Sequence, residues 1–385
     1  MKIAVLGSTG SIGNSLLNII NKNPKKINII LLTANKNHKK LFKYAKKFNV
    51  KNLIITNPQS YKILKSKTKN LKINVFNNYE CLNKIFKSKV DYVMSSIVGL
   101  SGLEPTLKII KFTKKIAIAN KESIICGWNL IKKELIKYNT EFIPVDSEHF
   151  SIWYGLKNSE KNKLECIYLT ASGGSIQKTP IEKINKLKIK DLLSHPNWSM
   201  GQKITIDSAT MMNKLFEIIE ARNIFNIEYK NIIVVIHPSS YIHAILKYND
   251  GMIKIIAHDT TMEIPIFNSI FGDKNKKFNS KKINYKIMNN LNFKKVDKKK
   301  YPAIKLLKNL PTKFSLFDTI IVSANDFLVE MFLNKIISFN DIYKKIKYVI
   351  NLEELQKFRN LKPKNVNEII NLNRYVHFKL REKCV

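Results

Sequence analysis

The first residues of the chain run from a short apolar strand into a glycine-rich loop. The sequence from Lys2 to Gly13 is KIAVLGSTGSIG, which has glycines at positions 7, 10 and 13. An amphipathic stretch follows directly. Glycine lets a backbone come close to a pyrophosphate, and the amide groups at the start of the following helix attract its negative charge. The pattern therefore predicts a dinucleotide-binding loop after the first strand of a parallel sheet. A plain tight turn is the alternative interpretation of the same glycines.

Short apolar runs alternate with helical patterns through the first part of the chain. Runs that are typical of buried strands occupy 2–7, 27–34, 52–56, 91–98, 115–120 and 141–145. Strands that alternate with helices are typical of a doubly wound, mainly parallel sheet. We therefore predict an α/β fold with an N-terminal Rossmann-type domain.

The pattern changes along the 385 residues, which are too many for one simple core. Strand and helix patterns are mixed in the middle, a stretch rich in lysine and asparagine follows, and helical periodicity dominates the end. We predict an NADPH-binding domain at 1–145, an α+β catalytic domain at 146–271, a linker at 272–297 and a C-terminal helical-bundle domain at 298–385.

The formal net charge of +38 raises the hypothesis of a nucleic-acid-binding protein. The type of base argues against it, because only four of the 67 basic residues are arginine. Arginine is the residue that makes bidentate contacts to bases and phosphates. Lysine, asparagine and isoleucine are abundant together, and all three have AT-rich codons. We therefore expect no specific nucleic-acid partner, and we interpret the charge as drift in an AT-rich genome.

Cysteine and hydropathy patterns bear on the cellular compartment. The four cysteines are scattered and form no CxxC pair, which argues against a zinc site and a disulfide framework. The start of the chain does not have the pattern of a signal peptide, and no apolar run reaches about 18 residues. We expect a cytoplasmic protein without a membrane partner.

The end of the second predicted strand indicates which nicotinamide cofactor is bound. An NAD site usually has an acidic residue there, which holds the ribose 2′-hydroxyl. This chain has TANKNHKK at 33–40, with Asn35, Lys36 and Asn37 and no acid. The missing acid favours NADPH over NADH.

The motif AIANKES at 117–123 closes another predicted strand. Ligands bind at the carboxyl ends of strands in such sheets, so Asn120, Lys121 and Glu122 are candidates to line the cofactor or the reacting centre. An ordinary helix start is the alternative, with Glu122 beside the helix dipole.

Two carboxylates follow the apolar run EFIPV. Asp146 and Glu148 point to the same side if the chain there is extended, and they supply half of a hard-cation site. The largely apolar helix predicted around 208–223 offers Glu217 or Glu220 as a third carboxylate. Lys214 shares a face with Glu217. An exposed helix with a simple ion pair is the alternative.

Three further segments have polar side chains in flexible surroundings. TASGG at 170–174 follows a strand and is a candidate to hold a phosphate through Ser172 and backbone amides. The loop at 194–203 contains Trp198, and we predict that it is a lid over the substrate. His195 in this loop is a substrate ligand, a lid contact or a surface residue. Ser208 is a candidate helix N-cap.

Taken together, the motifs resemble the 1-deoxy-D-xylulose-5-phosphate reductoisomerase family. The resemblance rests on GSTGSIG, ANKES, PVDSEH, TASGG, HPNWSMG, DSATMMNK, EAR, IHPSS and YPAIKL, which occur in the family's order from residue 7 to about residue 306. It implies a metal-dependent rearrangement of the substrate's carbon skeleton, followed by reduction with NADPH to 2-C-methyl-D-erythritol 4-phosphate, in isoprenoid precursor biosynthesis. It also implies a homodimer.

The resemblance assigns roles to individual residues. Mg²⁺ or Mn²⁺ would be held by Asp146, Glu148 and Glu217, with Lys121 close to metal and substrate. The substrate would be bound by Ser147, Ser172, His195, Trp198, Ser208, Asn213 and Lys214, in addition to Lys121, Glu148 and Glu217. The cofactor would be lined by Gly7, Thr9, Gly10, Ser11, Ile12, Asn35, Lys36, Asn37, Asn120, Glu122 and Gly201.

Two positions depart from the family pattern. Glu263, in HDTTMEIPI, occupies the place of an arginine in the family's PDMRTPI, and VSAND at 322–326 replaces NAANE. Neither is among the metal or phosphate residues, so we expect consequences for packing, lid support or dimer contacts. A different sugar-phosphate dehydrogenase with the same cofactor domain is the competing hypothesis, and it would need no metal.

Overall fold

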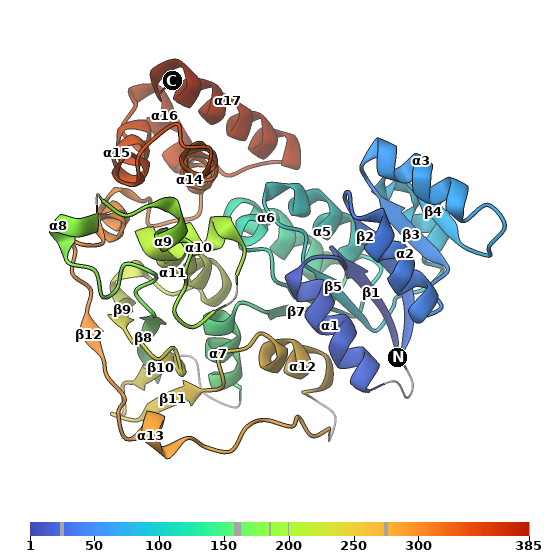
Figure 1. Cartoon of the computed structure of the whole chain (residues 1–385), viewed down its shortest axis with the longest axis horizontal. Coiled ribbons are helices and arrows are strands. Elements are labelled where there is room, and N and C mark those ends of the chain that lie inside the picture. Colours follow the sequence, from blue (N-terminus) through green and yellow to red (C-terminus); the bar gives the residue numbers. More distant parts are fainter. Residues whose placement is uncertain (24–26, 158–162, 185, 199, 273–275, 385) are drawn as a thin grey trace. The chain divides into compact units, whose positions relative to one another are not determined.

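A computed structural model of the chain describes residues 1–23, 27–157, 163–184, 186–198, 200–272 and 276–384 (Figure 1). The chain divides into two units. Over the described residues, the first comprises 1–123, 130–146 and 262–278, and the second comprises 124–129, 147–261 and 279–385. Residues 262–271, which the sequence analysis assigned to the catalytic domain, thus belong to the first unit. The four domain ranges stay a prediction, and residues 273–275 of the linker lie outside the described residues.

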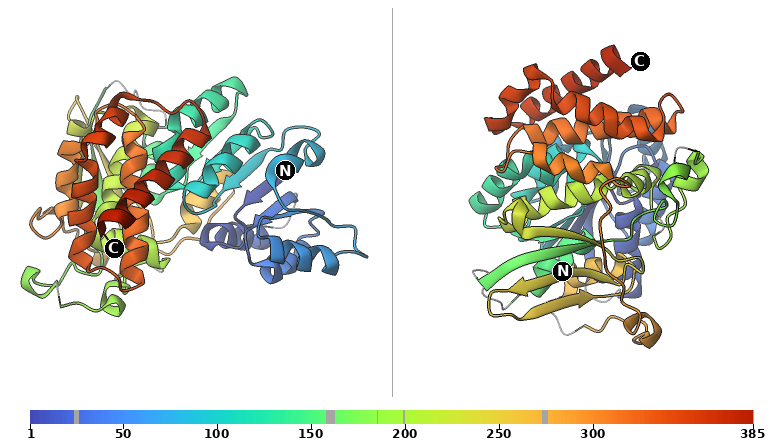
Figure 2. Two further views of the ribbon diagram at one scale, coloured as in Figure 1. Left: turned by 90° about the horizontal axis from the view of Figure 1, so that it is seen from above. Right: turned by 90° about the vertical axis from the view of Figure 1, so that its left-hand side faces the viewer.

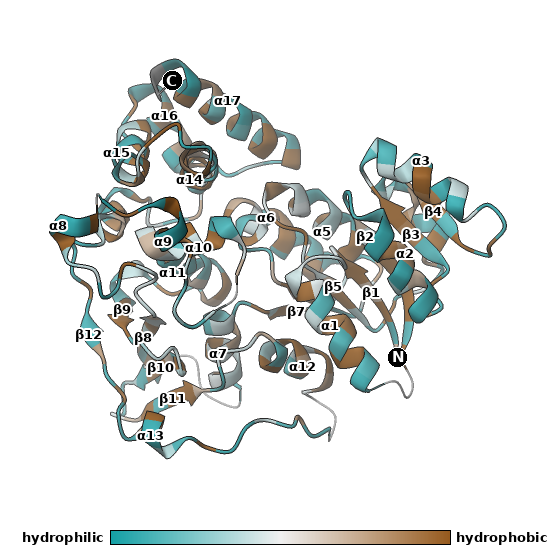
Figure 3. Cartoon of the chain, in the orientation of Figure 1, coloured by the Kyte–Doolittle hydropathy of each residue, from teal (hydrophilic) through white to brown (hydrophobic). Residues whose placement is uncertain are grey.

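The first unit contains a seven-stranded parallel sheet in the order β4-β3-β2-β1-β5-β6-β7. Its strands are mostly apolar and stand out in brown in Figure 3. They are β1 (Lys2–Leu6), β2 (Asn28–Ala34), β3 (Asn52–Ile55), β4 (Asn74–Phe76), β5 (Tyr92–Ser95), β6 (Lys115–Ile118) and β7 (Glu141–Pro144). The predicted α/β fold is confirmed. Strand β4 was not predicted, because its three residues give too short an apolar run.

Helices connect these strands, and several begin at a residue that caps them. Asn37, Asn57 and Asn120 accept hydrogen bonds from backbone N–H groups through their side chains. Such caps satisfy amide groups that lack partners inside the helix. The helices are α1 (Ser11–Lys22), α2 (His38–Lys47), α3 (Pro58–Lys67), α4 (Leu82–Ile85), α5 (Leu103–Ile110) and α6 (Lys121–Lys137).

The chain returns to the first unit with helix α12 (Glu263–Phe271). Tyr92 of β5 shares a buried 2.7 Å hydrogen bond with Ser269, which anchors α12 to the sheet. Glu263 lies in the first turn, where the helix dipole favours a carboxylate, and its Oε2 is 3.8 Å from Nζ of Lys22 in α1. The glutamate that departs from the family pattern therefore has a structural partner in this chain.

The second unit has a mixed five-stranded sheet in the order β11-β10-β8-β9-β12. Only β8 and β9 are parallel. The strands are β8 (Leu164–Ala171), β9 (Ile232–Ile236), β10 (Ile242–Tyr248), β11 (Ile253–Ala257) and β12 (Lys294–Lys295). Apolar side chains of α7 (Ser147–Gly155) and α11 (Met212–Phe225), such as Ile152 and Ile218, pack with Ile167 and Leu246 into one buried core. This packing holds two site-bearing helices against the sheet.

The end of the chain is helical, as predicted. In Figure 2 the helices α14, α15 and α17 form one group near the C-terminus. Apart from α7 and α11, the remaining helices of this unit are shorter than these three. The helices are α8 (Ile181–Ile184), α9 (Ile189–Leu192), α10 (Gln202–Thr210), α13 (Tyr285–Met288), α14 (Phe317–Leu333), α15 (Phe339–Ile350), α16 (Glu353–Gln356) and α17 (Val366–Cys384), with a 3-10 helix at Pro302–Asn309.

Three local predictions are wrong. The helix expected around 208–223 is two helices, α10 and α11, because Met211 adopts a left-handed φ of 68° between them. Ser208 therefore lies inside α10 and is not an N-cap. The backbone at 146–148 is not extended either, because α7 begins at Ser147 and places Glu148 in its first turn.

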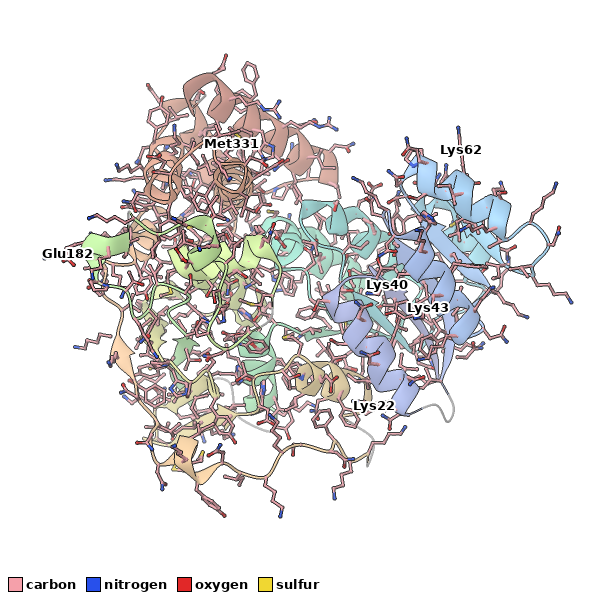
Figure 4. The ribbon with its side chains drawn as sticks, viewed as in Figure 1. Lys22, Lys40, Lys43, Lys62, Glu182 and Met331 are labelled. Carbon is pink, nitrogen blue, oxygen red and sulfur yellow. The ribbon has the colours of Figure 1, made fainter. Side chains whose placement is uncertain are left out.

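Lysines project from the outer faces of the helices. Figure 4 labels Lys22 on α1, Lys43 on α2 and Lys62 on α3, and all three side chains are exposed. This distribution agrees with the interpretation of the lysine runs as solvated faces. Among the described residues, no helix combines the length and hydropathy needed to cross a membrane.

Candidate active site

The glycine loop lies at the point where the strand order of the parallel sheet changes direction. β1 pairs with β2 on one side and with β5 on the other. Gly7 has a φ of +77°, and a Cβ on it would lie 2.6 Å from the carbonyl oxygen of Ser96. A Cβ on Gly13 would lie 2.5 Å from the carbonyl oxygen of Gly7. Both positions therefore require glycine, and the loop leads directly into the N-terminus of α1.

The other predicted cofactor residues of this loop lie at the same helix start. Gly10 is the N-cap of α1 without a side-chain cap, and Ser11 and Ile12 form the first turn, which has no acidic residue. The carbonyl oxygen of Thr9 accepts a 3.4 Å hydrogen bond from Lys40. The first N–H groups of a helix have no partner inside the helix, and with no acidic residue beside them they fit an anion at this terminus.

The residues after β2 are exposed and polar. Asn35 donates a 2.8 Å hydrogen bond to Thr56, and Asn37 caps α2. Lys36 is exposed beside them, and no acidic residue stands at this strand end. The structure keeps all three at the carboxyl edge of the sheet, where a cofactor's ribose would be held.

The motif ANKES begins helix α6. Asn120 caps the helix and its amide donates to the carbonyl oxygens of Ile97 and Gly99, so it organises the strand end. Glu122 is buried in the first turn. Nζ of Lys121 lies 2.9 Å from a carboxylate oxygen of Asp146, and both side chains are mostly buried. Lys121 therefore places a positive charge beside the first of the predicted metal ligands.

Three carboxylates meet where β7 passes into α7. Asp146 lies between β7 and α7, and Ser147 alone separates it from Glu148. Carboxylate oxygens of Asp146, Glu148 and Glu217 of α11 lie within 4.8 Å of one another. The convergence that the sequence analysis expected across some seventy residues is present in the structure.

Lys214 lies between two of these carboxylates. Its Nζ donates to Glu148 Oε1 at 2.7 Å, to Glu217 Oε2 and to the carbonyl oxygen of Thr170. Burial lowers the pKa of Lys214, but the charges of Glu148 and Glu217 and their hydrogen bonds outweigh it, and the pKa is raised above its usual value. Lys214 therefore carries its positive charge throughout the physiological pH range.

Two smaller polar groups complete this cluster. Ser147 donates a 2.6 Å hydrogen bond to Glu148 Oε2, and Asn213 donates to Glu217 Oε1. Each carboxylate that faces Lys214 is thus oriented by a second neighbour. Asn213 and Lys214 lie in the first turn of α11, because the break at Met211 starts a new helix there.

A buried pair lies behind the carboxylates: Glu220 was named only as an alternative third carboxylate, and His149 was not predicted as a site residue. His149 lies with Nε2 2.9 Å from the carbonyl oxygen of Glu217, and its Nδ1 is 3.5 Å from Glu220 Oε2. Both side chains are almost fully buried. The pair joins α7 to α11 and so fixes the spacing of Glu148 and Glu217. The signal for it was the apolar helix that carries a second glutamate one turn after Glu217.

Ser172 and His195 form a hydrogen bond after β8. Nδ1 of His195 accepts from the backbone N–H groups of Asn197 and Trp198 at 3.2 and 3.0 Å, so Nε2 carries the hydrogen and donates to Ser172 Oγ at 3.0 Å. Burial lowers the pKa of His195, which keeps the ring neutral. Gly174 also donates to Ser172 Oγ, at 3.0 Å, which leaves the hydroxyl hydrogen of Ser172 for a further acceptor.

The predicted lid loop at 194–203 is anchored at several points, and its Ser199 lies outside the described residues. Asn197 donates to the carbonyl oxygen of Pro238 at 2.6 Å and to Ser240 Oγ at 2.8 Å. Trp198 is half-buried, with its ring edge-on to His243. Gly201 is exposed, and its cofactor role stays a prediction. Asn197 was missed because an asparagine in a loop has no distinguishing pattern.

Ser208 lies beside the loop that carries Ser172. A Cβ on Gly174 would lie 2.8 Å from the carbonyl oxygen of Ser208, so the two backbones are in close contact. Asp207 is buried and accepts a 2.7 Å hydrogen bond from Asn325 of α14. The replaced motif VSAND therefore serves to hold α10 against the C-terminal helices.

Three family models match successive parts of the chain. Residues 3–127 match the model of 1-deoxy-D-xylulose 5-phosphate reductoisomerase, 142–225 match its C-terminal domain, and 259–377 match a further DXP reductoisomerase C-terminal domain. A 1-deoxy-D-xylulose 5-phosphate reductoisomerase of Pelagibacter ubique (strain HTCC1062) is 58% identical over 386 residues and covers 100% of each chain. This chain belongs to the 1-deoxy-D-xylulose 5-phosphate reductoisomerase family. It is an NADPH-dependent oxidoreductase, as the motifs predicted.

More distant relatives agree. The reductoisomerase of Clostridium tetani (strain Massachusetts / E88) is 36% identical and covers 99% of each chain. The solved enzyme of Zymomonas mobilis, in complex with NADPH, has a TM-score of 0.88 at 29% identity and covers 100% of this chain and 99% of its own. A DOX-P reductoisomerase in complex with NADPH, fosmidomycin and magnesium has a TM-score of 0.90 at 30% identity, with 100% and 99% covered. The fold prediction is confirmed over the whole length.

Proposed function

We propose that the chain converts 1-deoxy-D-xylulose 5-phosphate with one divalent metal ion held by Asp146, Glu148 and Glu217. The convergence of these three carboxylates supports the proposal most strongly. All donors are oxygen atoms, which Mg²⁺ and Mn²⁺ prefer. Magnesium is also the metal of a structurally similar reductoisomerase. When bound, the metal supplies Lewis-acid polarisation of the substrate's carbonyl and hydroxyl oxygens.

The lysines balance the charge of this cluster. Lys214 contacts Glu148 and Glu217, and Lys121 contacts Asp146, so each carboxylate has an ammonium neighbour. A carboxylate cluster without cations would resist ionisation, because like charges repel at short distance. We assign Lys214 and Lys121 to substrate oxygens that gain negative charge during the rearrangement. Ser147 and Asn213 orient the carboxylates for that step.

The phosphate group of the substrate would be held on the other side of Lys214. Ser172 has a hydroxyl hydrogen to donate, and Ser208 lies in contact with the same loop. His195 remains neutral and fixes Ser172, while Trp198 is placed by the same imidazole. We therefore assign Ser172, Ser208, Asn213 and Lys214 to phosphate and hydroxyl groups, with Trp198 as the lid contact.

NADPH would bind at the glycine loop of the first unit. Gly7 and Gly13 leave no room for a side chain, and the terminus of α1 attracts the pyrophosphate. The strand end without an acidic residue suits the 2′-phosphate, with Lys36 beside it. Similar reductoisomerases have been solved with NADPH. Bound there, the cofactor supplies the hydride for the reduction step.

A homodimer and a cytoplasmic location complete the proposal. The family resemblance supports the dimer, and Cys81, Cys126 and Cys166, which are free and buried, support a reducing compartment. We also propose that the lysine-rich surface has no specific nucleic-acid partner, so binding to nucleic acid should fall steeply as salt rises.

The deciding experiment follows the near-ultraviolet absorbance of NADPH with 1-deoxy-D-xylulose 5-phosphate as substrate. We expect oxidation with Mn²⁺ or Mg²⁺, complete loss after chelation, and recovery when metal is returned. Oxidation that persists without metal would assign the cofactor domain to a metal-independent dehydrogenase. No oxidation by the folded, metal-loaded protein would contradict the proposal.

A further inference from the structure

The motif YPAIKL begins with Tyr301, whose side chain reaches the loop after β8. Tyr301 is 3% exposed, and its hydroxyl donates a 2.8 Å hydrogen bond to the carbonyl oxygen of Gly173. The two residues are 128 positions apart. We propose that Tyr301 is a positioning residue for the substrate's phosphate, because it holds the loop that carries Ser172. The inference rests on the proposed role of Ser172.

The residue before Tyr301 holds the same loop. Nζ of Lys300 donates to the carbonyl oxygen of Gln177 at 2.8 Å and to that of Thr179 at 2.7 Å. Two consecutive side chains therefore bind three carbonyl oxygens of one loop. This arrangement fixes the loop from the side of the chain that leads into the C-terminal helices.

Neighbouring groups lie close to the loop on the Tyr301 side and on the α10 side. Gly173 has a φ of +86°, and a Cβ on it would lie 3.0 Å from the Tyr301 hydroxyl and 2.6 Å from Cγ of Gln177. Gly174 has a φ of +63° and touches the backbone of Ser208. The loop is thus enclosed between Tyr301 and α10, so a change at Tyr301 reaches Ser172 and Ser208 together.

The hydrogen bond from Tyr301 also fixes the orientation of the peptide group between Gly173 and Gly174. A carbonyl oxygen carries partial negative charge and would repel a phosphate. Because the Tyr301 hydroxyl binds the Gly173 carbonyl, the negative end of this peptide faces Tyr301. The N–H group of this same peptide, which belongs to Gly174, donates to Ser172 Oγ and keeps the serine in place beside His195. Loss of the Tyr301 hydroxyl removes the partner that holds this orientation.

The test compares two changes of tyrosine to phenylalanine. Tyr248 lies in β10 of the same unit at 5% exposure, and its buried hydroxyl has no hydrogen-bond partner among the described residues. Steady-state kinetics with 1-deoxy-D-xylulose 5-phosphate would be measured for Tyr301→Phe, Tyr248→Phe and Ser172→Ala, with NADPH affinity measured by fluorescence. Thermal unfolding checks that each variant is folded.

For Tyr301→Phe we expect KM to rise about tenfold, since a buried carbonyl loses its partner. The value of kcat should change less than about twofold, because uniform binding is lost and not transition-state binding. NADPH affinity should not change. Tyr248→Phe should leave all three values as in the wild type. Lys300→Met, which acts farther along the loop, should raise KM by a smaller factor and provides a second variant if Tyr301→Phe does not fold.

The possible failures can be told apart. A raised KM in Ser172→Ala with a wild-type KM in Tyr301→Phe would overturn the inference and leave the proposed phosphate site standing. A wild-type KM in both would contradict the phosphate site itself. A fall in kcat or in NADPH affinity for Tyr301→Phe would also overturn the inference, because the effect would then lie outside the phosphate-binding loop.

Discussion

The two units of this enzyme build their binding sites in different ways. In the first unit the glycine loop is one continuous segment, Gly7 to Gly13, in which the backbone is the binding surface. In the second unit the polar side chains come from α7, the loops after β8 and α9, and helices α10 and α11. The first site depends on the absence of side chains, and the second depends on charged side chains held by packing.

The two kinds of site should be sensitive to different substitutions. A backbone site is damaged by any added atom, since the space is already filled by neighbouring backbone. A side-chain site is damaged when one member of a charged cluster is lost, because its partners remain buried without compensation. Changes in the glycine loop should therefore leave the metal bound, and changes in the carboxylate cluster should leave NADPH bound.

The largest expected effect comes from Glu217→Gln in the second unit. The change removes a carboxylate that faces Lys214 and the proposed metal, so we expect kcat to fall about a hundredfold to a thousandfold. Mn²⁺ affinity, measured by electron paramagnetic resonance, should fall as well, and NADPH affinity should remain. Glu228→Gln is the matched control, because Glu228 is exposed and pairs with Lys230 on the surface. Wild-type turnover in Glu217→Gln would remove this residue from the metal site.

For Gly7→Ala in the first unit we expect a smaller effect, which falls on NADPH binding and spares metal binding. The new Cβ would lie 2.6 Å from the carbonyl oxygen of Ser96, so we expect NADPH to bind about tenfold more weakly while Mn²⁺ affinity is retained. Gly99→Ala is the control, because Gly99 has a similar φ of +74° but nothing within 4 Å of its Cβ position. Equal losses in both variants would show that backbone conformation matters here and close approach does not.

The smallest expected effect is a graded loss of stability in acid, confined to the second unit. Burial lowers the pKa of His195, His237, His258 and His377, and all four lie in this unit. The unfolded chain takes up protons at a higher pH than these folded sites do. The stabilising contribution is therefore complete above the ordinary histidine pKa of about 6.5, and it is lost as the pH falls through the lowered values.

Tryptophan fluorescence isolates this effect, because Trp128, Trp153 and Trp198 all lie in the second unit. Urea unfolding followed by this signal should show a lower free energy of unfolding in mild acid than at pH 8. His377→Gln should reduce the slope, since it removes one titrating site in α17. A free energy that rises on acidification would contradict the prediction.

The sequence was informative where the physical cause is local. The strand–loop–helix pattern identified the glycine loop, and the missing acid after β2 is visible without a structure. The motifs also identified Asp146, Glu148 and Glu217 as a set. The backbone around them was predicted less well, because Met211 ends one helix and starts another with a left-handed φ that no glycine or asparagine announces. Met211 is 2% exposed, so tertiary packing holds it in this conformation.

Residue types and their order were therefore enough for the fold class, the cofactor and the family. Contacts between distant segments were not predictable, because each rests on how helices and strands pack. Lys214 lies between Glu148 and Glu217, the neutral imidazole of His195 joins Ser172 to the lid, and Tyr301 holds Gly173 across 128 positions. The sequence gives the chemical type of each side chain, but the packing of the whole unit determines which partner that side chain contacts.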